Sequence, residues 1–129
     1  MLNFKSDYEC SICNAQKEIV LNRHIDAENF REIVMNDRLN VFQCDVCGYE
    51  QKLDFPVCYI NNKENFAVWW IPFEEPRVEK EKKIFRRLMG PDSYYGQAPE
   101  LYNWEEFKET ILKFERGELR GNPISFISR

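Results

Sequence analysis

The feature that most constrains how this chain can fold is a repeated Cys-x-x-Cys motif, found at Cys10 and Cys13 and again at Cys44 and Cys47. A Cys-x-x-Cys turn can direct two thiolates at one metal ion, and two such turns supply the four soft ligands of a tetrahedral zinc site. Positions 14 to 43 lie between the pairs, which is enough chain for a strand, a helix and a returning strand. We therefore expect one metal ion to staple two β-segments together at the base of an inserted helix.

The residues around the two motifs repeat as well. An aromatic residue, Tyr8 or Phe42, stands two positions before each pair, and Asn14 or Gly48 follows each pair directly. Both Asn and Gly tolerate a left-handed backbone, which lets the chain leave a tight turn without a clash at Cβ. The repeated context predicts that both motifs form the same kind of metal-binding turn.

Four cysteines fill a tetrahedron and leave no coordination position for water or substrate, so we expect one structural Zn2+. Such a site contributes on the order of 10 kcal/mol or more to folding. A Cys→Ser substitution at any of the four positions, or chelation, should therefore cost the fold. The only histidine, His24, and the fifth cysteine, Cys58, are not needed as ligands. We expect a partly exposed strand histidine and a buried thiol.

Disulfides or a redox couple would be alternative uses of these cysteines. The first seven residues contain Asn3, Lys5, Ser6 and Asp7 and lack the continuous apolar segment of a secretory signal. We therefore expect a cytoplasmic chain, in which structural disulfides are rare. A thioredoxin-like site would place one Cys-x-x-Cys at the start of a helix. The segments that follow the two pairs, 14–25 and 49–55, have the pattern of strands instead, which favours metal binding.

The composition is that of one packed domain. Of 129 residues 43% are hydrophobic and 15% aromatic, which is enough for a core and argues against a disordered adaptor. The net charge of -4 does not favour a nucleic-acid partner for the chain as a whole. The longest apolar run, at 66–73, is too short to span a bilayer, so no membrane partner is expected.

Local patterns predict an α+β fold. We expect strands at 16–25, 39–42 and 49–55, a hairpin of 57–61 and 65–71, and helices at 27–35, 76–89 and 104–116. Asp26 and Asn103 are predicted to cap the first and last helices. A small antiparallel sheet with a zinc-ribbon-like site of four cysteines would thus carry one helix between the Cys pairs and two C-terminal helices. The whole chain, 1–129, would be a single domain with a β-rich core at 8–73, a helical part at 76–117 and a loose tail at 118–129.

Taken together, several motifs resemble a CpXC-type domain. They are the two Cys pairs, a helix opening near Asp26, Leu39-Asn40-x-Phe42 before the second pair and Gly48 after it, Phe55-Pro56, and a hairpin with Tyr59 that ends at Trp70-x-Pro72. The resemblance covers 8–73, and 100–117 is similar to the C-terminal helix that such proteins often carry. The family is named for two Cys-Pro-x-Cys turns, whereas Ser11 and Asp45 stand in the place of proline here; proline would stiffen the turn but binds no metal. The resemblance implies a fold and a zinc site formed by the four cysteines, with no reaction attached.

We weigh three classes of function. A closed metal site, many aromatic residues and no visible catalytic constellation favour a zinc-stabilised module that binds another protein; the sequence does not define its oligomeric state. The alternative is a nucleic-acid-binding zinc ribbon that uses the helix at 77–88, where six basic residues face two acidic ones, although a solvated helix face is the simpler interpretation. An enzyme is not expected, because the sequence has no glycine-rich phosphate loop, no Ser/His/Asp set and no His-x-x-x-His pair.

Candidate partner surfaces come from aromatic and basic residues in the second half of the chain. We select Tyr94 and Tyr95, because exposed tyrosines are good anchors, together with the basic pair Arg86 and Arg87. The neighbouring tryptophans Trp69 and Trp70 are further candidates. Because adjacent strand residues point to opposite faces, we expect one to face the core and the other to lie under a helix.

Overall fold

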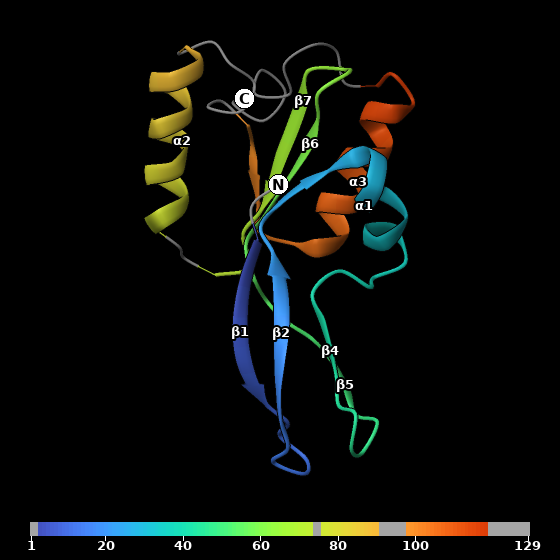
Figure 1. Cartoon of the computed structure of the whole chain (residues 1–129). Coiled ribbons are helices and arrows are strands. Elements are labelled where there is room, and N and C mark those ends of the chain that lie inside the picture. Colours follow the sequence, from blue (N-terminus) through green and yellow to red (C-terminus); the bar gives the residue numbers. More distant parts are fainter. Residues whose placement is uncertain (1–2, 74–75, 91–97, 119–129) are drawn as a thin grey trace.

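The protein consists of an arm and a head. The computed structural model describes residues 3–73, 76–90 and 98–118. Two β-hairpins, residues 3–22 and 41–53, project together as the arm from a body of sheet and helices, and the other described residues form this head (Figure 1). The strands are β1 (Asn3–Glu9), β2 (Gln16–Asn22), β3 (His24–Asp26), β4 (Val41–Gln43), β5 (Glu50–Lys52), β6 (Val57–Asn61), β7 (Phe66–Trp70) and β8 (Glu100–Leu101). The helices are α1 (Ala27–Met35), α2 (Pro76–Met89) and α3 (Trp104–Glu115).

The arm is built from two antiparallel ribbons, β1 with β2 and β4 with β5. In the first ribbon Glu9, directly before Cys10, lies opposite Gln16. In the second ribbon Gln43, directly before Cys44, lies opposite Glu50. Each Cys pair therefore forms the end of a hairpin. The sequence did not predict β1, because its residues are mostly polar and exposed. The strand forms because its backbone pairs with that of β2, and none of its side chains is fully buried.

The head contains a four-stranded sheet in the order β3-β6-β7-β8. The central strands β6 and β7 form the predicted antiparallel hairpin, whereas the short outer strands β3 and β8 run parallel to their neighbours. The α+β class is confirmed, with one helix between the Cys pairs and two after the hairpin. The β-structure is divided into this sheet and the two ribbons of the arm.

Helices cover both faces of the sheet (Figure 1). One apolar cluster joins the sheet to α1 and α3, and a second joins it to α2. Residues along β7 alternate between the two clusters: Trp70 packs at 4.7 Å from Trp104 of α3, whereas Trp69 belongs to the cluster under α2. Both tryptophans are buried on opposite faces of the sheet, so neither is a partner surface.

The three predicted helices form at the expected places. The Asp26 side chain accepts a hydrogen bond from the Asn29 N–H at 2.9 Å, and Asn103 accepts one from Glu106 at 3.1 Å, so both predicted N-caps are present. These caps satisfy N–H groups that the first turn of a helix leaves free. No helix in the described ranges is long and apolar enough to cross a membrane.

Candidate metal centre

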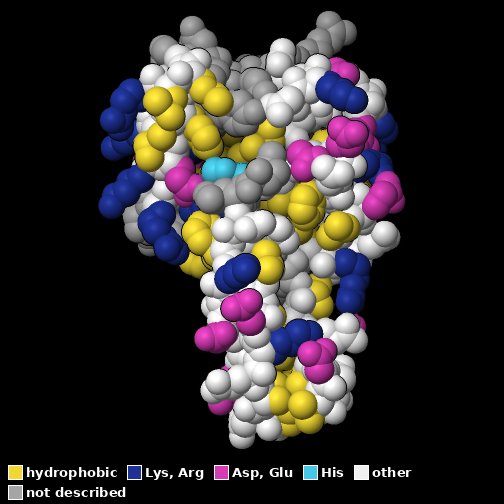
Figure 2. All heavy atoms as spheres, in the orientation of Figure 1, with side chains coloured by type: hydrophobic (Ala, Val, Ile, Leu, Met, Phe, Trp, Pro, Cys, Tyr) yellow, Lys and Arg dark blue, Asp and Glu magenta, His cyan; other side chains and the backbone are white. Residues whose placement is uncertain are grey.

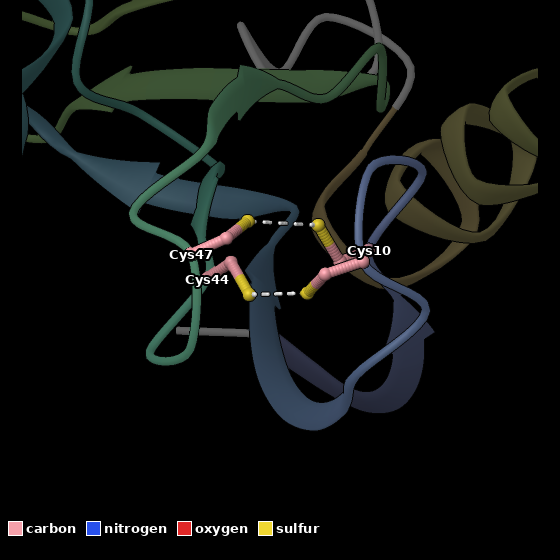
Figure 3. A group of neighbouring side chains, drawn as sticks. Cys10, Cys44 and Cys47 are labelled. Carbon is pink, nitrogen blue, oxygen red and sulfur yellow. Dashed lines mark hydrogen bonds between the residues drawn. The ribbon is translucent and has the colours of Figure 1, made fainter.

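The four cysteines predicted as ligands converge at the tip of the arm (Figure 3). Their Sγ atoms all lie within 4.8 Å of one another. The first cysteine of each pair faces the second of the other: Cys10 Sγ lies 3.6 Å from Cys47 Sγ, and Cys13 Sγ lies 3.5 Å from Cys44 Sγ. No disulfide joins them in this structure, since the sulfurs of a disulfide are about 2.05 Å apart. The observed separations approach the edge of about 3.8 Å that a tetrahedron with metal–sulfur bonds of about 2.3 Å would have. The four thiols are thus positioned to bind one metal ion.

The two turns have matching backbone hydrogen bonds. In the first turn, Cys10 N–H donates to the Ala15 carbonyl and Asn14 N–H donates to the Cys10 carbonyl, both at 2.9 Å. Cys44 and Gly48 repeat this pattern in the second turn, at 2.8 and 3.0 Å. The predicted left-handed residues are also in place, with φ of 63° at Asn14 and 78° at Gly48. The repeated sequence context therefore gives two equivalent turns, as predicted.

Backbone amides and neighbouring sulfurs shift the pKa values of the thiols. The N–H groups of Cys47 and Val46 lower the pKa of the Cys44 thiol from 9.0 to about 6, against the opposing effect of burial. Although the Ala15 N–H lowers the pKa of Cys13, the adjacent Cys44 sulfur and burial outweigh it and raise that pKa to about 12. Four close sulfurs cannot all carry a negative charge without a cation. A coordinated metal ion would deprotonate them.

Contacts between the hairpins hold the two turns against each other. Tyr8 and Phe42, the aromatic residues that precede the pairs, pack with ring centroids 4.6 Å apart, and the Tyr8 hydroxyl donates to Gln51 Oε1 at 3.0 Å. On the outside, Lys17 Nζ lies 3.0 Å from Asp45 Oδ1. The aromatic position of the motif therefore supports the site by packing behind the cysteines.

Asn40 joins the two hairpins where the arm meets the head. Its side-chain oxygen accepts a hydrogen bond from Asn22 N–H at 2.8 Å, and its amide nitrogen donates to the Asn22 carbonyl at 3.0 Å. Asn40 is buried and has a φ of 52°, a left-handed conformation that Asn adopts more readily than most residues. Sequence reasoning did not assign this role, because the partner lies 18 positions away and no local pattern marks it.

Lys52 links the arm to the head. Its Nζ lies 3.7 Å from the Trp104 ring centroid and 4.2 Å from that of Trp70, and within the described chain this buried nitrogen has no hydrogen-bond acceptor. Burial lowers the pKa of Lys52. The two indoles attract the ammonium by cation–π interaction, which offsets part of the cost of removing it from water.

His24 lies in the head and belongs to a separate charged cluster. Its Nε2 is 2.9 Å from Glu81 Oε1, and the same carboxylate accepts hydrogen bonds from the buried Arg23. Burial opposes ionisation of Glu81, but the hydrogen bonds from His24 and Arg23 lower its pKa. Cys58 is fully buried in β6, as expected, and burial raises its pKa.

The residues proposed as a partner surface are only partly visible. Arg86 and Arg87 lie on α2, where Arg86 is half-buried and Arg87 exposed. Tyr94, Tyr95 and most of the tail at 118–129 lie outside the described residues. Of the predicted sites, the metal ligands are thus the set that the structure brings together.

The whole arrangement can be compared with known proteins. No curated protein and no solved structure matches this chain. A family model described as CpXC protein matches residues 8–118, which include both Cys pairs, the sheet of the head and all three helices. The resemblance noted in the sequence is therefore confirmed, and the chain belongs to the CpXC protein family.

Proposed function

We propose that this chain is a zinc-stabilised module that binds another protein. The observation that carries the proposal is the convergence of four thiol sulfurs within 4.8 Å. A tetrahedral set of four thiolates is a coordination environment that Zn2+ prefers. Ca2+ and Mg2+ require oxygen ligands, which the four cysteines do not offer.

The metal in such a site would have a structural role. Four sulfurs occupy all four positions of the tetrahedron, so no position remains for water or a substrate. A metal bound in this way would have no catalytic role of its own. Because thiolate ligands must stay reduced, the proposal also favours the reducing cytoplasm as its place of action.

The metal would hold apolar side chains in the solvent at the end of the arm. Ile12 and Val46 occupy the same position in the two turns, directly before the second cysteine, and are 64% and 74% exposed. Apolar side chains on a rigid projecting element are suited to protein contacts, since their burial in an interface is favourable. This feature supports a protein as the partner.

Nucleic-acid binding remains the second candidate, because α2 carries a row of exposed basic side chains. Phosphate-driven binding would weaken steeply as salt rises, and a titration of duplex DNA and RNA across a salt series measures this. The acidic net charge of the chain supports the protein partner instead.

Two measurements test the proposal. Elemental analysis of protein purified under reducing conditions should give one zinc per chain. With nuclease-treated lysate, the wild-type protein should retain a specific protein that an Ile12→Ser/Val46→Ser variant with full metal content retains less well. A protein without stoichiometric metal would refute the zinc site, and equal retention of every captured protein by the wild type and the variant would refute the protein-binding role of the arm.

A further inference from the structure

Charged side chains on the inner face of α2 fix how this helix is rotated. Glu81 accepts hydrogen bonds from Arg23, and its Oε1 lies 2.9 Å from His24 Nε2. The next residue, Lys82, is buried and donates to the Ala98 carbonyl at 2.9 Å. Because these contacts lie deep between α2 and the sheet, the helix cannot turn about its axis without breaking them. The side chains on its outer face therefore have a fixed direction.

A row of basic side chains runs along that outer face. Lys80, Lys83 and Arg87 are spaced by three and four residues, which places them on one side of a helix, and all three are exposed. We refer to them as the basic ridge. Within the described ranges no acidic side chain pairs with any of the three, whereas Glu79 pairs with Arg86 at 3.6 Å. The positive charge of the basic ridge is thus available to a partner.

An apolar row lies beside the basic ridge. Ile84 and Leu88, one helical turn apart, are 45% and 75% exposed; we refer to them as the apolar ridge. Figure 2 shows basic side chains along the outer side of α2 and an apolar patch next to them. The two ridges run in the same direction along the helix, so a partner that follows α2 contacts both.

The charge of α2 indicates what kind of partner fits. The helix has six basic and two acidic residues, whereas the whole chain has a net charge of -4. A second copy that docked through the same helix would bring two basic ridges together, and like charges repel. The complementary surface must therefore be acidic, and it is not the α2 helix of a second copy.

The apolar ridge distinguishes between acidic partners. A nucleic-acid backbone could neutralise the basic ridge but would leave Ile84 and Leu88 against a charged, hydrated surface. An amphipathic helix can present acidic side chains and apolar side chains in adjacent rows at the same spacing of three to four residues. When two helices pack, such rows fit between those of the partner.

We propose that the outer face of α2 docks an amphipathic helix of another protein, with Asp or Glu side chains against the basic ridge and apolar side chains against the apolar ridge. This inference rests on the proposed function only in taking a protein as the partner. It places the docking surface on the head, away from the metal centre.

A synthetic helical peptide with a row of Glu beside a row of Leu tests the proposal, with a scrambled peptide of the same composition as its control. In fluorescence anisotropy, the metal-loaded full chain should bind the ordered peptide at least about tenfold more tightly than the scrambled one. The variant Lys80→Glu/Lys83→Glu/Arg87→Glu should lose this binding and instead bind a peptide with Lys in place of Glu. The variant Ile84→Ser/Leu88→Ser should bind the Glu peptide more weakly while its salt dependence is unchanged.

The variant Lys5→Glu/Lys63→Glu replaces positive with negative charge at exposed positions outside α2. It should bind the Glu peptide as tightly as the wild type does. Equal binding of the ordered and the scrambled Glu peptides would overturn the proposal. So would binding of the ordered peptide that Ile84→Ser/Leu88→Ser leaves unchanged. Tighter binding to duplex DNA, or to phosphatidylcholine vesicles containing phosphatidylserine, would overturn it as well. Since metal content is measured separately on every variant, a failure here is distinguishable from a failure of the zinc site.

Discussion

The arm and the head of this protein are stabilised in different ways. In the head, large side chains such as Trp69, Tyr59 and Phe66 are almost completely buried in two clusters, one on each face of the sheet. Among the described residues of the arm, the only buried cluster consists of Phe42 and two of the cysteines, with a few half-buried side chains around them. Two-stranded ribbons with so little core are at best marginally stable in water. The head can rely on apolar burial, whereas the arm would depend on the metal ion that its four cysteines are positioned to bind.

Removal of the metal should have the largest effect and tests this difference directly. The sequence alone predicted that loss of the metal site would cost the whole fold. Because the head has its own buried clusters, we expect loss of a site that contributes on the order of 10 kcal/mol to unfold only the arm. All three tryptophans lie in the head, so their burial reports on its folding. After chelation, or in a Cys44→Ser variant, amide protection should vanish at residues 3–22 and 41–53 while the tryptophans stay buried. Their emission maximum should move only by the small shift that loss of the Lys52 contact produces.

Cys58→Ala is the control for this experiment, because the fifth cysteine lies in the head and should leave metal stoichiometry unchanged. Simultaneous loss of the tryptophan signal and of arm protection would show that arm and head fold as one unit. The distinction between their sources of stability would then be wrong.

The second largest effect is expected inside the head, where burial involves charge as well as apolar surface. Glu81→Ala would leave the buried guanidinium of Arg23 without its carboxylate, a change that typically costs about 3–5 kcal/mol. Glu79→Ala, two positions away on the same helix, removes only an exposed ion pair with Arg86 and should cost no more than about 0.5 kcal/mol.

Urea denaturation followed by tryptophan fluorescence measures both variants. Metal content should stay at the wild-type level in both, since Glu81 lies far from the cysteines in the fold. Similar unfolding free energies for the two variants would mean that Lys82 and the apolar contacts of Val78 and Phe85 hold α2, and that the Glu81 carboxylate adds little.

The difference between arm and head also explains what the sequence could predict. The ligands were predictable because their spacing is local and the metal requires that chemistry, and the helices because Asp26 and Asn103 mark where two of them begin. The separation into arm and head was not, because it depends on which strands pair. Lys52 and Glu81 were missed for the same reason: each acts on residues far away in the chain, and exposed lysines and glutamates look identical in sequence.

The third prediction concerns Lys52, where the two regions meet. Lys52→Ala removes the cation–π contacts with Trp70 and Trp104 and leaves a gap beside the two rings, which should lower the free energy of unfolding by about 2 kcal/mol. Lys52→Met keeps an apolar stem of similar length but no charge. Because the cation–π contacts offset only part of the cost of burying the ammonium, this variant should be at least as stable as the wild type. The tryptophan emission maximum should shift in both variants. A Lys52→Met variant as unstable as Lys52→Ala would show that the charge, and not packing alone, joins the arm to the head.

The smallest effect is a pH dependence at Asp37, between α1 and α3. Hydrogen bonds from Lys108, and then from Trp104, lower the pKa of Asp37 below 3.8. In the unfolded chain the carboxylate binds its proton at higher pH than in the folded protein, so the stabilisation is fully present above pH 4 and is lost as pH falls through the lower, folded pKa. The side chain is 52% exposed and solvent screens the pair, so we expect less than about 1 kcal/mol. Urea midpoints should place Asp37→Asn below the wild type at pH 6, and the difference should shrink as the pH falls below 3.8. Asp7→Asn, at an exposed position in the arm, controls for the loss of one negative charge. A wild-type advantage that persisted at the acidic end would mean that Asp37 joins the helices through its shape and not through its charge.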